Sequence, residues 1–300
     1  MIRPLIVLAA LLAAVAAAQG SQAVFTAGAS NAGSTFATAS DWVAPAVTLT
    51  SPANGASTNS TTPTLSGAAG NATGDSTTVT VKIYSGTSAS GTPVQTKTAT
   101  RSGATWSTSA STLAAGTYTA QATQADSAGN TGTSSANTFT VDATKPTASK
   151  VVATNKTGGT GGKIESGDSV TFTYSEPISP ASVWSGWDGS STTVRVRFTN
   201  NASNDSFTVL DSSSNATINL GSVTTNGNYV SATTTFSSTM VRSADGASIV
   251  VTLGTPSSVQ STAVGAKNMT WTVGAGITDL AGNAIATPAT WSETDSDVDF

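Results

Sequence analysis

Short runs in which apolar and polar residues alternate recur along the chain from about residue 45 onwards. In the run TVTVKIY, which begins at Thr78, the side chains of Val79, Val81 and Ile83 fall on one side of an extended chain. The intervening threonine and lysine side chains fall on the other side. This period of two predicts antiparallel strands with one buried face and one face in water.

About seven such runs lie between residues 45 and 142, and an immunoglobulin-like β-sandwich has about that number of strands. The runs are VTLT at Val47, TLSGA at Thr64, TVTVKIY at Thr78, VQTKTA at Val94, ATWST at Ala104, TYTAQATQA at Thr117 and NTFTV at Asn137. We therefore expect one antiparallel sandwich in this region.

Residues 143–300 contain a further eight or nine runs, separated by longer loops. They include SVTFTY at Ser169, TVRVRF at Thr193, SFTVL at Ser206, ATINL at Ala216, ATTTF at Ala232, SIVVTL at Ser248, MTWTV at Met269 and ATWSE at Ala289. The sequence thus predicts an all-β protein of two tandem sandwiches, the second larger and of open strand order.

The composition narrows the chemistry. The chain has no cysteine and no histidine, and only 9% of its residues are charged. Thiol and imidazole nucleophiles, imidazole general bases, disulfides and the common zinc ligands are therefore excluded. No serine motif of a hydrolase stands in a convincing context, so we expect no enzyme. The formal charge of −4 and the lack of a basic stripe also give no indication of nucleic-acid binding.

The first 23 residues have the organisation of a secretory signal peptide. Arg3 provides a positive charge, Leu5–Ala18 is an apolar stretch too short for a comfortable membrane span, and small residues around Ala18 and Ala23 suit cleavage. No second apolar run of membrane length follows. We expect a secreted protein, not embedded in a membrane after cleavage.

Residues 24–44 form a leader rich in glycine, serine and alanine. Its residues Phe25, Thr26, Asn31, Gly33 and Phe36 resemble the start of mature biofilm-fibre and spore-coat subunits, which a specialised signal peptidase exports. The resemblance implies an extracellular fibre subunit or accessory. A leader of this kind is a candidate donor strand for self-assembly at an exposed sheet edge.

The stretch from Leu113 to Tyr118 has the L-x-x-G-x-Y spacing of a tyrosine corner. Together with other motifs, it makes residues 45–142 resemble a bacterial Ig-like repeat of cell-surface proteins. The matching motifs are S-P-x-x-G from Ser51, T-P-x-x-S-G-x-A from Thr62, D-x-A-G-N from Asp126 and F-T-V-D-x-T-x-P from Phe139.

Residues 143–300 resemble a second class of bacterial Ig-like domain, found in S-layer and surface proteins. The match is carried by Ser166-Gly167-Asp168 and Ser175-Glu176-Pro177, with Tyr174 where phenylalanine is usual. The two resemblances imply a non-enzymatic structural or adhesive protein. Its expected partner is a cell-surface or matrix protein or a glycan.

The pentapeptides DSAGN and DLAGN occur once in each predicted sandwich. In such a sequence aspartate can accept from the backbone of its own turn, glycine can take positive φ, and asparagine tolerates the left-handed region. We predict structural turns, capped by Asp126 and Asp279. The other structural residues of the two turns are Gly129, Asn130, Gly282 and Asn283.

Two separate sets of carboxylate side chains are alternative candidates for a calcium site. Calcium takes six to eight oxygen ligands. The C-terminal ETDSDVDF would place four carboxylates on one face of a strand, Glu293, Asp295, Asp297 and Asp299, although a solvated outer face would look the same. The second alternative is the junction of the two domains, where Asp142 would join Glu176 or Asp168. Without either site, the protein needs no cofactor.

Two tryptophans in VWSGWDG, Trp184 and Trp187, are the candidates for sugar binding, because an exposed indole on a β-sandwich can stack on a sugar ring. The alternative is structural, with one ring sealing the edge of the core. The sugar-binding hypothesis requires an indole exposed in a groove.

Overall fold

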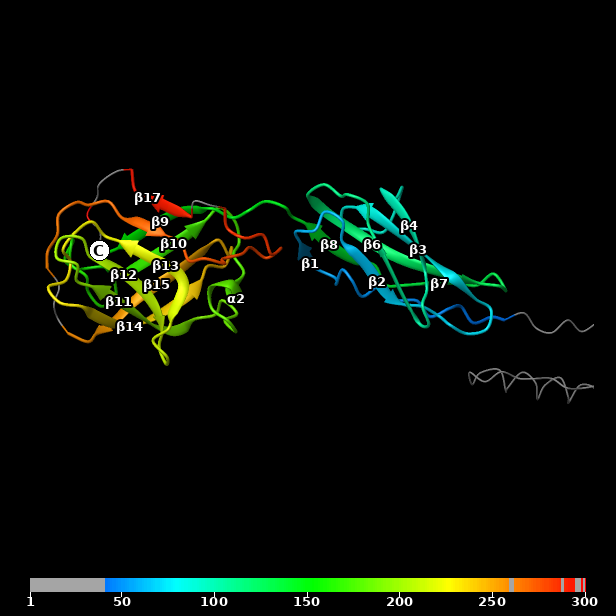
Figure 1. The fold of residues 1–300 in the computed structure, drawn as a ribbon, viewed down its shortest axis with the longest axis horizontal. Helices are drawn as coiled ribbons and strands as arrows, with labels where there is room; N and C mark the ends of the chain where they lie inside the picture. The colour runs from blue at the N-terminus through cyan, green and yellow to red at the C-terminus, as the bar shows by residue number, and fades with distance from the viewer. Residues whose placement is uncertain (1–40, 259–261, 287–288, 295–297, 299) are drawn as a thin grey trace, which may run out of the picture. The chain divides into compact units, whose positions relative to one another are not determined.

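The computed structural model describes residues 41–258, 262–286, 289–294, 298 and 300, and Figure 1 shows their fold. Within these residues, seventeen strands and one short helix, α2 (Pro180–Val183), make up the regular structure. The predicted all-β class with sandwich-like sheets is confirmed. The predicted signal peptide and residues 24–40 of the leader lie outside the described residues.

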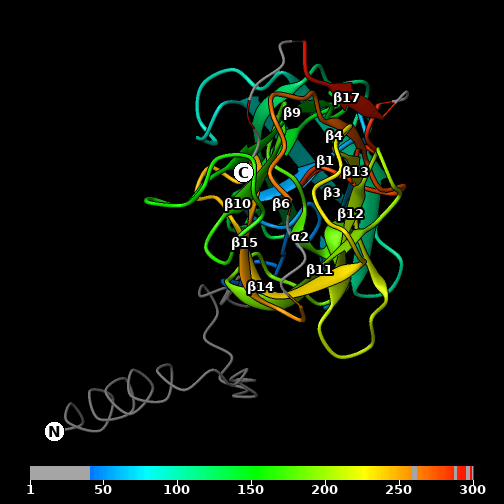
Figure 2. The same cartoon turned by 90° about the vertical axis from the view of Figure 1, so that its left-hand side faces the viewer.

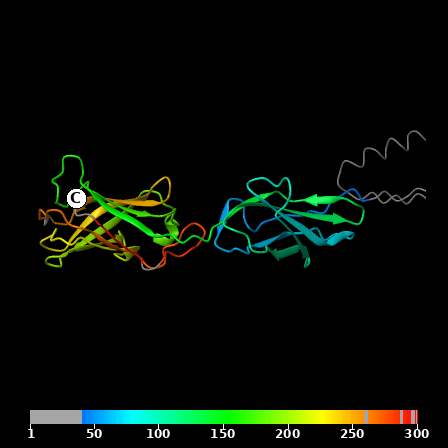
Figure 3. The same cartoon turned by 90° about the horizontal axis from the view of Figure 1, so that it is seen from above.

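The first sandwich contains strands β1 to β8. Its larger sheet has the order β1-β8-β6-β3-β4, with β7 paired to β6, and its smaller sheet pairs β2 with β5. Figure 3 shows these strands in two layers. The strands are β1 (Ala56–Thr58), β2 (Thr64–Ala68), β3 (Asp75–Ser85), β4 (Gln95–Thr100), β5 (Thr105–Ser109), β6 (Gly116–Asp126), β7 (Thr131–Thr133) and β8 (Asn137–Val141).

Apolar side chains from both sheets fill the core of the first sandwich. Val79, Val81 and Ile83 of β3 are completely buried, as the alternating pattern predicts. The indole N–H of Trp106 donates to the carbonyls of Thr48 and Ala68, at 3.0 and 2.9 Å. The tryptophan therefore ties the segment before β2 to the small sheet while its ring fills the core.

Tyr118 lies near the start of β6 and packs its ring against Phe139 of β8. Its hydroxyl donates to the carbonyl of Ala114 at 3.0 Å. This is the contact that defines a tyrosine corner, because the side chain bonds back to the connection that leads into its own strand.

The second sandwich is one antiparallel sheet of nine strands in the order β17-β16-β13-β12-β11-β14-β15-β10-β9. Figure 2 shows β9, β10, β15, β14 and β11 side by side in this order. The edge strands β17 and β9 also approach each other, so the sheet closes around its own core. The strands are β9 (Ala148–Thr154), β10 (Ser169–Tyr174), β11 (Thr192–Thr199), β12 (Ser206–Asp211), β13 (Thr217–Thr224), β14 (Thr234–Arg242), β15 (Ser248–Pro256), β16 (Thr270–Thr272) and β17 (Thr290–Ser292).

Aromatic rings dominate the core of the second sandwich. Phe198 lies opposite Phe207 in the β11–β12 pair, and Val223 lies opposite Trp271 in the β13–β16 pair. The ring of Phe300 is also buried, and it contacts Phe198, Phe207 and Tyr229 edge-on. Edge-to-face packing adds to the stabilisation that burial provides.

The sequence pattern missed several short elements. Strands β1 and β7 have three residues each, too few for alternation to be visible. The helix α2 has only four residues and begins at a proline. The predicted strand at Val47 forms no assigned strand, although Thr48 and Thr50 donate backbone hydrogen bonds to β2.

Among the described residues, no helix combines the length and apolar character needed to cross a membrane.

Two tyrosine hydroxyls provide a matched test of this packing. The hydroxyl of Tyr174 is buried beside Trp271 and has no hydrogen-bond partner in the described part of the chain, and burial raises its pKa. Tyr174→Phe should raise the free energy of unfolding by about 1 kcal/mol, because it removes an unsatisfied polar group.

Tyr118→Phe should lower the free energy of unfolding by about 1 kcal/mol, because it deletes the bond to Ala114. Urea denaturation of both variants measures the two effects. Destabilisation by Tyr174→Phe would show that its hydroxyl has a partner in solution.

Candidate metal site

The turn DSAGN connects β6 to β7 and is held by its own side chains. The carboxylate of Asp126 accepts from the backbone N–H groups of Ala128 and Asn130, at 2.9 and 2.8 Å. Its second oxygen accepts from the side-chain amide of Asn130 at 2.7 Å. The hydrogen bond from the Asn130 amide is the main cause that lowers the pKa of Asp126.

The turn DLAGN repeats two of these contacts in the second sandwich. The carboxylate of Asp279 accepts from the backbone N–H of Asn283 at 2.8 Å and from its side-chain amide at 2.7 Å. This turn lies in the long connection between β16 and β17 and is adjacent to neither strand. It closes an isolated bridge between Thr278 and Ala284, and a second bridge joins Asp279 to Ile178.

Each residue of the pentapeptide has a distinct role. The positive φ belongs to the glycines, 96° at Gly129 and 91° at Gly282. Neither Asn130 nor Asn283 has a left-handed backbone conformation. Our expectation that the asparagines would use the left-handed region is therefore wrong. Asn130 and Asn283 act instead through their amides, which bind the aspartate at the start of each turn.

The DLAGN turn also binds residues of the first sandwich and of the connecting segment. Asn59, which follows β1, donates its backbone N–H to the carbonyl of Ala281 and its side-chain amide to the carbonyl of Gly282. The amide of Asn283 donates to the carbonyl of Asp142, directly after β8. These bonds connect residues 141 to 223 positions apart in sequence.

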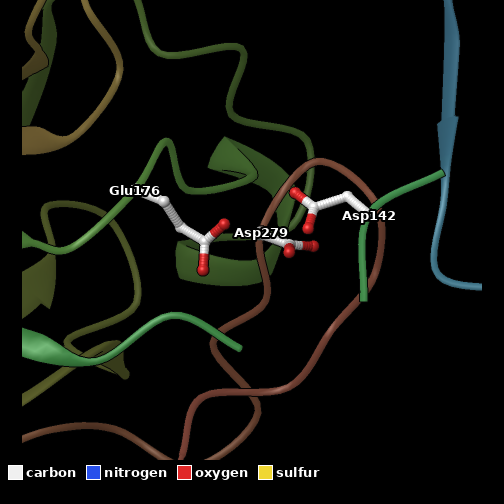
Figure 4. Close-up of side chains that lie close together, drawn as sticks. All are labelled: Asp142, Glu176 and Asp279. Atoms are coloured by element: carbon white, nitrogen blue, oxygen red, sulfur yellow. The ribbon is translucent and has the colours of Figure 1, made fainter. Parts of the chain in front are cut away.

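Three carboxylates converge at this place. Asp142, Glu176 and Asp279 each offer a carboxylate oxygen, and these oxygens all lie within 4.8 Å of one another. Figure 4 shows that the three side chains come from three separate segments. Asp279 is buried, whereas Asp142 and Glu176 are half-buried. Only the fold brings them together.

The surroundings of Glu176 disfavour the ionised form of its carboxylate. Its Oε1 atom is buried and has no hydrogen-bond partner among the described residues. Loss of hydration raises its pKa, and repulsion from Asp142 and Asp279 raises it further. Such an arrangement costs free energy when all three groups are ionised, unless a cation lies among them.

The donor set is suited to a hard cation. All three ligand groups are carboxylates, and neither histidine nor cysteine occurs in the chain to favour a softer metal. Asp142 and Asp279 also accept protein hydrogen bonds, from Thr144 and Asn283, yet each carboxylate keeps further lone pairs. Ca²⁺ fits best, because it accepts an irregular oxygen cage completed by water.

The sequence left open whether Glu176 or Asp168 joins Asp142 at the junction of the two domains, and the structure distinguishes between them. Asp168 is fully buried and accepts from the backbone N–H groups of Lys156 and Glu165, at 3.0 and 2.6 Å. It therefore holds a loop of the second sandwich and is not part of the carboxylate cluster. Asp279, which we assigned only a capping role, takes its place.

The C-terminal carboxylates do not form a described site. Glu293 accepts from the backbone N–H of Met269 at 2.6 Å, and this contact joins the end of β17 to the start of β16. Asp295, Asp297 and Asp299 lie outside the described residues.

The two tryptophans of the predicted sugar site differ in exposure. Trp187 is only 7% exposed, and its indole N–H donates to the carbonyl of Ser190 at 2.7 Å. Trp184 is half-buried and packs against the core while lining a shallow, open depression. The ring of Trp187 is thus occupied by the protein interior and offers no stacking surface.

Sequence reasoning missed Asn59 altogether. It lies in a polar loop, and no local pattern distinguishes it from the other asparagines of the chain. The repeated pentapeptide was the available signal for Asp279, but it indicated only a turn. The carboxylate cluster follows from contacts distant in sequence.

Comparison with known proteins places the first sandwich in a family. Residues 48–143 match the family model described as "Bacterial Ig-like domain", so this part of the chain is a domain of that kind. No curated protein matches the chain.

Solved structures show only distant likeness. The fibronectin(III)-like modules of CbhA from Clostridium thermocellum are 17% identical, with a TM-score of 0.28, over 70% of this chain and 90% of theirs. Dimeric latent PorU from Porphyromonas gingivalis is 16% identical, with a TM-score of 0.27, over 71% of this chain and 20% of its own.

The raised pKa of Glu176 gives a pH prediction for the metal-free protein. Because the folded state holds this proton to a higher pH than the unfolded state, the contribution of Glu176 to stability falls as pH rises through the window between the two pKa values. Lowering the pH from 7 towards 4.5, the ordinary pKa of a glutamate, should therefore stabilise the wild type relative to Glu176→Gln.

Urea denaturation in the presence of a chelator measures this difference. At pH 7 without metal, Glu176→Gln should be the more stable protein, because it lacks the repulsion. A constant difference in unfolding free energy between the two proteins from pH 7 to pH 4.5 would contradict this assignment.

Proposed function

We propose that this chain is a non-catalytic extracellular protein whose two β-sandwiches serve as a structural and adhesive unit at the cell surface. Ig-like domains typically have no catalytic role, and residues 48–143 are such a domain. The signal-peptide pattern of residues 1–23 supports export.

The observation that carries the proposal is the set of hydrogen bonds around the DLAGN turn. Two sandwiches joined only by a flexible tether would move independently of each other. A structural spacer benefits from direct contacts between its domains, because such contacts restrict that motion. Here Asn59 of the first sandwich binds the carbonyls of Ala281 and Gly282, and Asn283 binds the carbonyl of Asp142. The segment Trp42–Phe300 forms one compact unit.

Protease treatment of intact cells tests the cellular part of this proposal. An epitope-tagged protein should be digested from the outside while a cytoplasmic marker survives, and deletion of the gene should weaken attachment of cells to a surface or matrix. Protection of the tagged protein in intact cells would refute the extracellular assignment.

We further propose that Ca²⁺ binds the carboxylates of Asp142, Glu176 and Asp279. The buried, unpartnered Oε1 atom of Glu176 and the mutual repulsion of the three groups support this candidate. Bound there, the cation would link the segment after β8 to two loops of the second sandwich. The connection would then be stiffer with calcium than without it.

Calcium removal gives a direct test. Isothermal titration of the chelator-treated chain with CaCl₂ should show one site, and saturation with calcium should raise the melting temperature. Glu176→Gln should abolish both effects, because it removes one anionic ligand from the cluster.

Asp188→Asn is the matched control, since Asp188 is an exposed carboxylate that only caps Ser190. It should bind calcium as the wild type does. Equal loss of binding in the two variants, or no binding in the wild type, would dispose of the calcium site while leaving the extracellular role intact.

A further inference from the structure

The outer face of the second sandwich carries hydroxyl groups in continuous rows. One row crosses five neighbouring strands, and every member has a hydroxyl: Thr199, Ser206, Thr224, Thr270 and Ser292. The alternate positions in these strands point inward and belong to the aromatic core. The pleat therefore sets one apolar face against one face of hydroxyls.

A second row runs beside the first, across β14, β11, β12, β13, β16 and β17. Its members are Thr235, Arg197, Thr208, Ser222, Thr272 and Thr290. All of them are half-buried or exposed, and neither row contains a carboxylate. We call these two rows, together with Arg195, the hydroxyl face.

Two guanidinium groups lie on this face. Arg195 and Arg197 are two of the five arginines in the chain, and as alternate residues of β11 they project on the same side, about 7 Å apart along the strand. Arg195 donates to the side chain of Asn215 at 2.6 Å. Arg197 is exposed, and no described residue pairs with it.

An acidic residue of the neighbouring strand hydrogen-bonds within its own turn. Asp211 ends β12 opposite Val194, and its carboxylate accepts from Ser213 and Ser214 in its own turn. The hydrogen bonds from Ser213 and Ser214 lower the pKa of Asp211 to about 2. Among the described residues, no carboxylate forms an ion pair with Arg195 or Arg197, so both guanidinium groups can meet an anionic partner from outside.

We propose that the hydroxyl face binds an acidic polysaccharide, with Arg195 and Arg197 receiving its carboxylate groups. A guanidinium pairs with a carboxylate through two parallel hydrogen bonds. Threonine and serine hydroxyls both donate and accept, as the hydroxyls of a sugar do. Neighbouring strands are about 4.8 Å apart, which is similar to the length of one sugar residue in a chain.

This inference rests on the proposed extracellular function and gives the adhesive unit a ligand class. It differs from stacking on Trp184 or Trp187, because the contacts are ionic and polar. A neutral glycan would gain the hydroxyl contacts alone. Nucleic acid is the main competing polyanion, and the experiment includes it.

The test measures binding of the full chain without its signal peptide to immobilised polygalacturonate. We expect saturable binding, with little binding to dextran, a neutral polymer. The double variant Arg195→Ala/Arg197→Ala should bind at least about tenfold more weakly, because two charge-assisted contacts are lost. Arg195→Lys/Arg197→Lys should bind with intermediate affinity, since the charge remains without the paired geometry.

Lys82→Ala/Lys267→Ala is the charge-matched control. Both lysines are exposed, and Lys82 lies opposite Thr96 and Gln121 on the outer face of the first sandwich. This variant should bind polygalacturonate as the wild type does. Equal weakening in the two alanine variants, or equal binding to DNA and polygalacturonate, would overturn the proposal, as would the absence of binding. Protease accessibility on cells is independent of each of these results.

Discussion

The fold depends on burying every second side chain along antiparallel strands. The protein has no disulfide, and only 9% of its residues carry charge, so burial of apolar area must supply most of its stability. In the second sandwich this burial gathers Phe198, Phe207 and Trp271 on one face of the sheet. The same period places threonine and serine on the other face. The core and the hydroxyl face are therefore two consequences of one constraint.

The DxAGN turns show how one local structure takes on different roles. In both copies, asparagine binds the aspartate that begins the turn, and glycine adopts the conformation that other residues avoid. The first copy makes a hairpin between β6 and β7. The second copy also receives Asn59 and lies beside Asp142 and Glu176. Its neighbours thus give Asp279 a second role, in the carboxylate cluster.

Few residues of this chain are charged, so a charged group without a partner of opposite charge is a more informative indication of a ligand. Glu176 lies among other carboxylates, and Arg197 lies among hydroxyls with no paired acid among the residues that the structure describes. A buried anion without a counterion costs free energy. An exposed guanidinium costs little and remains available to a ligand. The two features are chemically complementary to a cation and to an anionic polymer, respectively.

The all-β class, most of the strands and the two turns are predictable from the sequence alone. Each of these depends on residues close in the chain, such as the alternation in Thr78–Tyr84 or the five residues from Asp126. The strand order of the second sandwich, the burial of Trp187 and the position of Asn59 depend instead on the complete fold. The meeting of Asp142, Glu176 and Asp279 belongs to the same group. The physical reason is that strand pairing and side-chain contact join residues far apart in sequence, which local periodicity does not specify.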